Sequence, residues 1–127
     1  MRQVLNTDQA PAPVGPYNQS ISANGTLYVS GQVAIDPTTG DMLQESIEVE
    51  TKQVMRNIGA ILKTAGLSYE DILMCNVFVT DMNNYGRINT IYAEFFNSET
   101  APARALVEVS RLPKDANVEI SVTATLK

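Results

Sequence analysis

The chain has 127 residues, of which 44% are apolar and 18% are charged, and its net charge is −5. This length and composition are typical of one globular domain, so we treat residues 1–127 as a single domain. The nine basic residues are scattered, which excludes the clustered positive charge on which nucleic-acid binding depends. The absence of histidine and the presence of one cysteine, Cys75, exclude histidine-based catalysis, zinc sites and internal disulfide bonds.

Residues 1–8 are too polar for a signal peptide, and no apolar run approaches the length of a membrane span. We therefore expect a cytoplasmic protein that does not associate with a membrane. Glycine-rich phosphate loops are also absent from the sequence. Any chemistry is left to carboxylates, arginine, tyrosine, hydroxyl groups, backbone groups and water.

In the first half of the chain, two strand patterns precede a helix pattern. Residues 17–22 and 26–30 predict two short strands joined by a turn around Ala23-Asn24-Gly25. From about Ile47, the apolar residues recur with a helical period, and Gly66 is typical of a helix C-terminus. The predicted buried face of this helix comprises Val54, Met55, Ile58, Ile61, Leu62 and Ala65.

The second half begins with residues 72–80, which predict a central strand because both of its sides are apolar. A helix over about residues 83–97, with Asp81 or Asn83 as its N-cap, and strands over residues 104–110 and 118–126 complete the chain. The order ββαβαββ predicts an α/β (α+β) domain in which two helices cover one face of a mixed sheet. Its other face is then solvated or covered by another copy, and the two-sided apolar strand favours an oligomer.

Arg104 opens one predicted strand, and Glu119 lies near the start of the next. Strands joined by a short loop are commonly antiparallel neighbours, so we expect these side chains to meet across the sheet. The planar guanidinium fork matches a substrate carboxylate, and a nearby glutamate can orient a water and accept its proton. The arginine should also keep Glu119 ionised unless burial outweighs it. From spacing alone, an ordinary cross-strand ion pair is the alternative.

Several segments resemble the RidA/YjgF family of reactive-intermediate (enamine/imine) deaminases, which are also described as endoribonuclease L-PSP proteins. The resemblance covers essentially the whole chain in the family's order, and the Pro-Ala-Arg segment with the later glutamate is its most specific part. The matching segments are Gly15-Pro16-Tyr17-Asn18-Gln19, Ser30-Gly31-Gln32, Ala65-Gly66-Leu67, Val77-Phe78-Val79-Thr80-Asp81, Pro102-Ala103-Arg104, Val107-Glu108-Val109, Arg111-Leu112-Pro113-Lys114 and Val118-Glu119-Ile120.

The resemblance implies a chorismate-mutase-like fold and a homotrimer with sites in the clefts between subunits. It implies a cofactor-free hydrolase that acts on C–N bonds, a 2-iminobutanoate/2-iminopropanoate deaminase. Such an enzyme converts small anionic 2-imino acids, formed from 2-aminoacrylate or 2-aminocrotonate, to 2-keto acids and ammonia. Pyridoxal-phosphate dehydratases that act on serine and threonine release those enamines, so the implied role is metabolite detoxification.

The same resemblance assigns roles to individual residues. It implies that Arg104 binds the substrate carboxylate and that Glu119 holds the water. Gly31 and Leu106 line the implied anion pocket, and the residues that line the cleft are Tyr17, Ser30 and Asn89. One departure is that many bacterial members have Ser-Cys after the arginine, where this chain has Ala105-Leu106. Any role of that thiol is therefore lost here.

Each of these residues also has a purely structural interpretation. Tyr17 is a packing aromatic, Asn89 faces solvent or bonds to a neighbouring backbone group, and Gly31 serves a bulge. Cys75, between apolar neighbours, is interpreted as a core residue and not as a nucleophile. For the whole protein, a 2-keto-acid-binding module without turnover is the first alternative. An endoribonuclease or translation inhibitor is disfavoured, because the chain is acidic and has no histidine.

Overall fold

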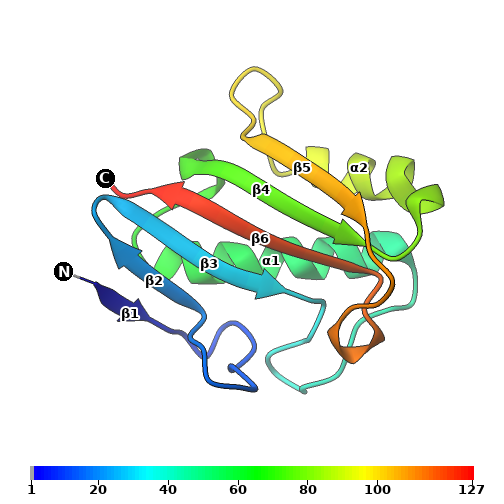
Figure 1. The fold of residues 1–127 in the computed structure, drawn as a ribbon, viewed down its shortest axis with the longest axis horizontal. Coiled ribbons are helices and arrows are strands. Elements are labelled where there is room, and N and C mark those ends of the chain that lie inside the picture. Colours follow the sequence, from blue (N-terminus) through cyan, green and yellow to red (C-terminus); the bar gives the residue numbers. More distant parts are fainter. Residues whose placement is uncertain (1) are drawn as a thin grey trace.

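The structure is a computed structural model that describes residues 2–127. It confirms the expected α+β fold class and the order of the predicted elements, and it adds one short strand at the start (Figure 1). The elements are β1 Gln3–Leu5, β2 Ser20–Ala23, β3 Thr26–Gln32, α1 Ile47–Thr64, β4 Ile72–Val79, α2 Tyr85–Ala93, β5 Ala103–Glu108 and β6 Val118–Thr125.

The strands form one six-stranded sheet in the order β1-β2-β3-β6-β4-β5. All neighbours are antiparallel except β4 and β5, which are parallel. The expectation that β5 and β6 are antiparallel neighbours is wrong, because β4 lies between them. The physical reason is the crossover through α2, which brings the chain back to start β5 at the same end as β4. The loop after β5 then passes the end of β4, and β6 enters between β4 and β3.

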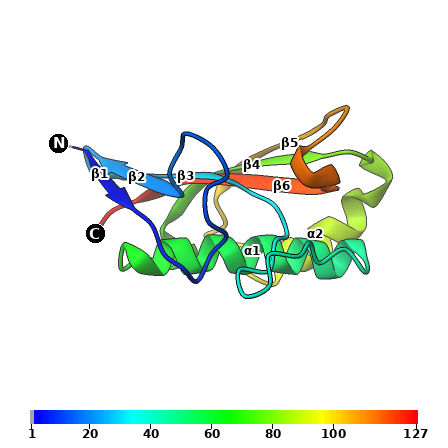
Figure 2. The ribbon, with the colours of Figure 1, turned by 90° about the horizontal axis from the view of Figure 1, so that it is seen from below.

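Both helices lie on the same side of the sheet, as predicted (Figure 2). The Ser46 side chain caps α1 by accepting a hydrogen bond from the Val49 amide at 3.1 Å. After the helix, Gly66 adopts φ +74°, which is the left-handed conformation expected of a C-terminal glycine. The apolar face of α1 is buried together with the inward-facing residues of β3, β4 and β6 in one core. Among its fully buried members are Ile58, Ile61, Leu62, Leu27, Val77 and Ile120.

The second helix is shorter than the sequence predicts. It begins at Tyr85 after a 3₁₀ turn over Met82–Asn84, and the Asp81 side chain caps that turn. It ends at Ala93, because the following amides bond to carbonyls three residues back, as in Phe95 N–H to Tyr92 O at 3.2 Å. Phe95 and Phe96 still pack against the core from this tightened turn.

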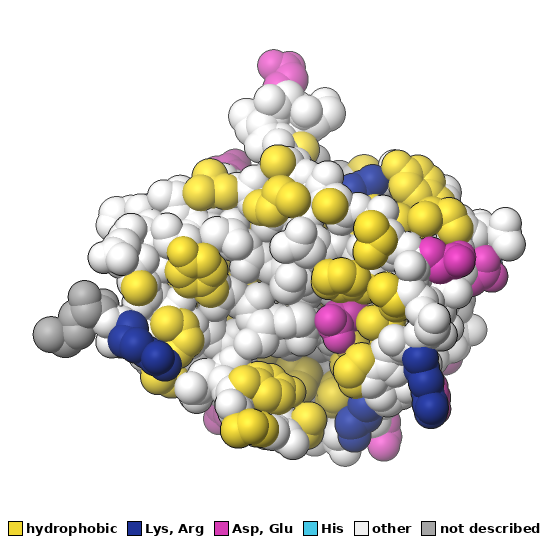
Figure 3. All heavy atoms as spheres, viewed as in Figure 1, with side chains coloured by type: hydrophobic (Ala, Val, Ile, Leu, Met, Phe, Trp, Pro, Cys, Tyr) yellow, Lys and Arg dark blue, Asp and Glu magenta, His cyan; other side chains and the backbone are white. Residues whose placement is uncertain are grey.

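The face of the sheet opposite the helices is uncovered in a single chain (Figure 3). Its side chains are mostly small or apolar, and Tyr28 and Val107 are 54% and 47% exposed. In the register of the described strands β3, β4, β5 and β6, Glu119 is the one charged residue that faces this side. No helix within residues 2–127 is long and apolar enough to cross a membrane.

Candidate functional site

Glu119, the second residue of β6, projects from the uncovered face of the sheet. It pairs with Phe78 of β4, and its neighbours in β6, Val118 and Ile120, point into the core. The Glu119 carboxylate accepts no hydrogen bond from any group in residues 2–127, and its side chain is only partly exposed. This partial burial raises the pKa of Glu119 above the ordinary glutamate value, because burial disfavours the charged form.

Gly31 lies directly against the Glu119 carboxylate. The pairing of β3 with β6 is irregular between Val29 and Gln32, so the strand bulges at this point. A Cβ atom added to Gly31 would lie 2.6 Å from Oε2 of Glu119. The bulge that was the structural interpretation of Gly31 is therefore present, and it also brings the backbone close to the carboxylate. Only glycine fits this approach without moving Glu119.

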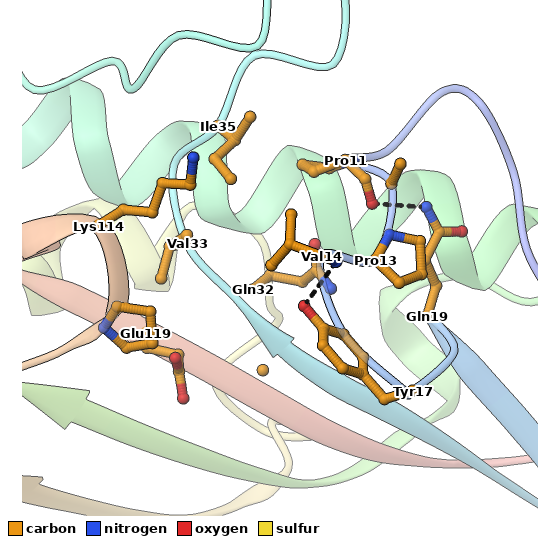
Figure 4. Close-up of a pocket in the computed structure, with 13 residues that line it drawn as sticks. Pro11, Pro13, Val14, Tyr17, Gln19, Gln32, Val33, Ile35, Lys114 and Glu119 are labelled. Atoms are coloured by element: carbon orange, nitrogen blue, oxygen red, sulfur yellow. Dashed lines mark hydrogen bonds between the residues drawn. The ribbon is translucent and has the colours of Figure 1, made fainter.

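Tyr17 lies on the far side of a hollow from Glu119, in the loop before β2 and not in a strand (Figure 4). Its hydroxyl oxygen accepts a hydrogen bond from the Val14 amide at 3.4 Å, which folds the loop over the ring. The hollow has a volume of about 90 Å³, and both Tyr17 and Gly31 line it with Glu119. Ser30 does not line it, because its hydroxyl donates to the Asn18 carbonyl at 2.6 Å and so positions the loop.

Arg104 is held firmly by helix α2. Its Nη1 donates to Oδ1 of Asn89 at 2.7 Å, and its Nη2 donates to the Tyr85 hydroxyl at 3.1 Å. Its Cζ atom also lies 4.8 Å from the centre of the Tyr92 ring, a cation–π contact that fixes the guanidinium plane. A guanidinium has five N–H donors, so most of them stay available for a substrate carboxylate.

Leu106 follows on the same side of β5, and its side chain packs against the main core. Leucine at this position therefore contributes to the core and does not line the hollow beside Glu119. Cys75 pairs with Arg104 in the neighbouring strand and is fully buried. Burial raises the pKa of the Cys75 thiol, which agrees with a core residue because the thiolate is the reactive form.

Within one chain, the structure does not bring Arg104 and Glu119 together. Arg104 lies beside Cys75 and Glu119 beside Phe78, and these two positions of β4 point to opposite faces of the sheet. The predicted contact across adjacent strands is wrong for this reason. Within one chain, burial therefore outweighs any effect of Arg104 on the pKa of Glu119. Instead there is an arginine half-site with Asn89 and a glutamate half-site with Tyr17 and Gly31.

The sequence reasoning missed the aromatic support of the arginine. Tyr85, Asn89 and Tyr92 lie four and three residues apart, a spacing that places them on one helix face. This spacing was a usable signal, although only the structure shows that Arg104 lies over that face. The Tyr92 hydroxyl is buried without a hydrogen-bond partner in the described chain, and burial raises the pKa of Tyr92.

The buried carboxylate of Glu50 holds the chain just before β6, the strand that carries Glu119. Glu50 of α1 is fully buried and accepts hydrogen bonds from the Asn117 amide at 2.7 Å and from Nδ2 of Asn117 at 2.8 Å. Asn117 precedes β6 directly, and its carbonyl also accepts from the Thr80 amide at 3.2 Å. These bonds fix the start of β6, two residues before Glu119.

The turn Pro113–Asp115 at the rim of the hollow has an uncommon backbone. Lys114 and Asp115 have φ values of +60° and +53°, a conformation that costs about 1–2 kcal/mol for each residue other than glycine. An Arg111–Asp115 ion pair at 2.9 Å and a bond from Nε2 of Gln44 to the Asp115 carbonyl at 3.1 Å hold it in place. Within residues 2–127, no cluster of three or more Cys, Asp and Glu side chains is arranged to hold a metal ion.

The chain is similar to known proteins over nearly its whole length. Residues 7–126 match the family model Ribonuc_L-PSP, described as endoribonuclease L-PSP. A RutC family protein from Synechocystis is 50% identical over 125 residues, which cover 98% of this chain and 96% of that protein. The mouse 2-iminobutanoate/2-iminopropanoate deaminase is 40% identical over 124 residues, which cover 98% of this chain and 91% of that enzyme.

A solved structure shares the same fold. The crystal structure of Escherichia coli TdcF with bound serine superposes with a TM-score of 0.92 at 35% identity, covering 98% of this chain and 99% of that one. The expected fold class is therefore confirmed by a relative as well as by the strand order.

Proposed function

Because the chain belongs to the RidA/YjgF (endoribonuclease L-PSP) family, we propose that it hydrolyses 2-imino acids such as 2-iminopropanoate and 2-iminobutanoate to 2-keto acids and ammonia. The observation that best supports this activity is the pair of half-sites. Arg104 is pre-oriented with free donors, and Glu119 is a free carboxylate with a raised pKa beside a small hollow. Mammalian relatives with the deaminase name add support.

The two half-sites act together only if they come from different copies of the chain. In this proposal, a second copy covers the open sheet face and places its Arg104 opposite Glu119. That face is nearly uncharged and exposes apolar side chains, which favours association. The family resemblance implies three copies. Sedimentation should then report a particle three times the 13.8 kDa chain, and a fully active monomer would contradict the shared site.

The proposed reaction needs no more than positioning and one proton relay. The guanidinium of Arg104 binds the substrate carboxylate through two parallel hydrogen bonds. Glu119 orients a water towards the imine carbon and takes its proton as the C–O bond forms. In the protonated imine, this proton then passes from Glu119 to the nitrogen of the carbinolamine. As the C–N bond breaks and the C=O bond forms, Glu119 takes the hydroxyl proton, and a keto acid and ammonia leave. In the single chain, burial raises the pKa of Glu119 and so makes it a stronger base than an ordinary glutamate, whereas Arg104 of the second copy favours the ionised form that accepts the proton.

The test is to generate 2-aminoacrylate with a serine dehydratase and to follow its disappearance with and without the protein. The proposal predicts faster formation of pyruvate and ammonia. The solved relative with bound serine favours one other function, which is the binding of small carboxylates without turnover. A binding module would bind pyruvate and leave the lifetime of the imine unchanged, so the same assay separates the two functions.

A further inference from the structure

The hollow of about 90 Å³ beside Glu119 opens on to further space in the single chain. A second hollow of about 270 Å³ adjoins the first, and five residues line both: Pro11, Ala12, Val14, Ile35 and Lys114. The side chain of 2-iminopropanoate is one methyl group. If its carboxylate lies on Arg104 and its imine carbon at Glu119, this methyl leaves the joined hollows largely unfilled.

The residues that line the joined hollows form an apolar wall and include one cationic side chain, Lys114. Prolines, Val14 and Ile35 supply the wall, and Lys114 lies where the two hollows meet. Figure 4 shows the Lys114 side chain extending towards Ile35, apart from the Glu119 carboxylate. In the described chain, Lys114 forms no ion pair. The one acidic residue of the second hollow, Asp36, already accepts a hydrogen bond from the Thr38 amide at 2.9 Å.

The backbone conformation of Lys114 also favours a functional role for this residue. Positive φ values in residues other than glycine concentrate at functional sites, where surrounding contacts hold them. Here Lys114 and Asp115 both adopt such values, and bonds from Arg111 and Gln44 hold Asp115. An ordinary surface lysine needs no such turn.

From these observations we infer that the protein acts on 2-imino dicarboxylates with a linear stem, such as 2-iminoglutarate. The methylene stem lies along the apolar wall, and the distal carboxylate pairs with Lys114. This inference rests on the proposed function, because it assumes that the reactive carbon lies at Glu119. It adds substrates with a second carboxylate to the small imino acids, whose side chains have only one or two carbon atoms.

The experiment compares two imines of similar length. An L-amino-acid oxidase, with catalase present, converts glutamate to 2-iminoglutarate and norleucine to 2-iminohexanoate, whose side chain is uncharged, and semicarbazide traps the imine that remains. The wild-type protein should have a higher kcat/KM for 2-iminoglutarate. In Lys114→Met, which keeps the aliphatic stem, the ratio of the two kcat/KM values should fall about fivefold. Lys114→Glu should lower this ratio further.

Lys63→Met is the matched control, since Lys63 is an exposed lysine in the last turn of α1, outside both hollows. Its ratio should equal that of the wild type. An unchanged ratio in Lys114→Met, an equal fall in Lys63→Met, or a wild-type preference for 2-iminohexanoate would each overturn the inference.

A binding measurement separates this inference from the proposed function. If 2-iminopropanoate is not hydrolysed, the proposed function fails. Calorimetric titration with 2-ketoglutarate and pyruvate then still tests the role of Lys114. If 2-ketoglutarate binds more tightly than pyruvate and Lys114→Met loses this difference, a dicarboxylate site at Lys114 is supported. Equal binding of the two keto acids by the wild type would contradict it.

Discussion

The arginine and glutamate half-sites differ in how far a single chain completes them. Arg104 lies on the helix-covered side, bonded to Asn89 and Tyr85 and stacked near Tyr92. Glu119 lies on the uncovered side and accepts no hydrogen bond within residues 2–127. One half-site is fixed before any ligand arrives, whereas the other leaves its carboxylate free for a water. In the proposed enzyme, substrate orientation and water activation would belong to separate surfaces that association joins.

The two half-sites also differ in their electrostatics. The arginine stays charged at any ordinary pH, and aromatic rings favour its cation. Burial instead raises the pKa of Glu119 and so favours its protonated form. The contrast can be tested by changing one half-site at a time.

The largest expected effect comes from Glu119→Gln, which keeps the shape of the side chain and removes the base. Turnover should fall by about 10²–10⁴-fold, while binding of pyruvate persists. In the wild type, kcat/KM should fall at acid pH, because only ionised Glu119 accepts the proton. Loss of pyruvate binding with unchanged turnover of bound substrate would instead indicate a structural role.

The next effect concerns the arginine half-site. Arg104→Lys keeps the charge but loses the planar fork, so kcat/KM should fall by about 10–100-fold, as expected for lost charge-assisted hydrogen bonds. Arg87→Lys is the control, since the exposed Arg87 pairs with Glu48 outside both half-sites. Nearly full kcat/KM in Arg104→Lys would show that bidentate binding is wrong. Circular dichroism should show an unchanged fold in both variants.

A smaller, structural effect is expected beneath the glutamate half-site. Glu50→Ala leaves both the Asn117 amide and its Nδ2 without an acceptor, so the free energy of unfolding should fall by about 3 kcal/mol. Glu45→Ala, an exposed glutamate before the same helix, should change it by less than about 0.5 kcal/mol. Equal denaturation midpoints for the two variants would mean that Glu50 does not hold the start of β6.

The smallest effect is a pH-dependent gain in stability from Glu119→Gln. The folded state raises the pKa of Glu119, so the folded wild-type chain binds the proton more tightly than the unfolded chain does. Ionised Glu119 therefore destabilises the folded single chain at pH 7, and this penalty vanishes at pH values below the ordinary glutamate pKa. Thermal melts at a protein concentration that keeps the chain monomeric should show a higher Tm for Glu119→Gln at pH 7 and no difference at acid pH. A lower Tm at pH 7 would contradict the sign.

The sequence was sufficient to predict the helices and strands, but not to predict which strands pair. The helical period before Gly66 and the strict alternation of residues 118–126 correctly predicted α1 and β6. The pairing of β5 failed, because a short loop between strands does not reveal that α2 has already placed β5 beside β4. The faces of Arg104 and Glu119 depend on this register, so local pattern alone was unable to separate them. The contact of Tyr85 with Arg104 was missed for the same reason. The position of Lys114 was missed because bonds from Gln44 and Arg111 to Asp115 set its turn.

Subunit mixing tests most directly whether one site takes Arg104 from one copy and Glu119 from another. Arg104→Ala and Glu119→Gln should each be inactive alone. When equal amounts are unfolded and refolded together, random assembly should place an intact arginine opposite an intact glutamate at about a quarter of the sites in a closed ring. A shared site predicts that about this fraction of wild-type imine hydrolysis returns. No recovery in a mixture shown to contain mixed oligomers would mean that both residues act within one chain, and would contradict the account.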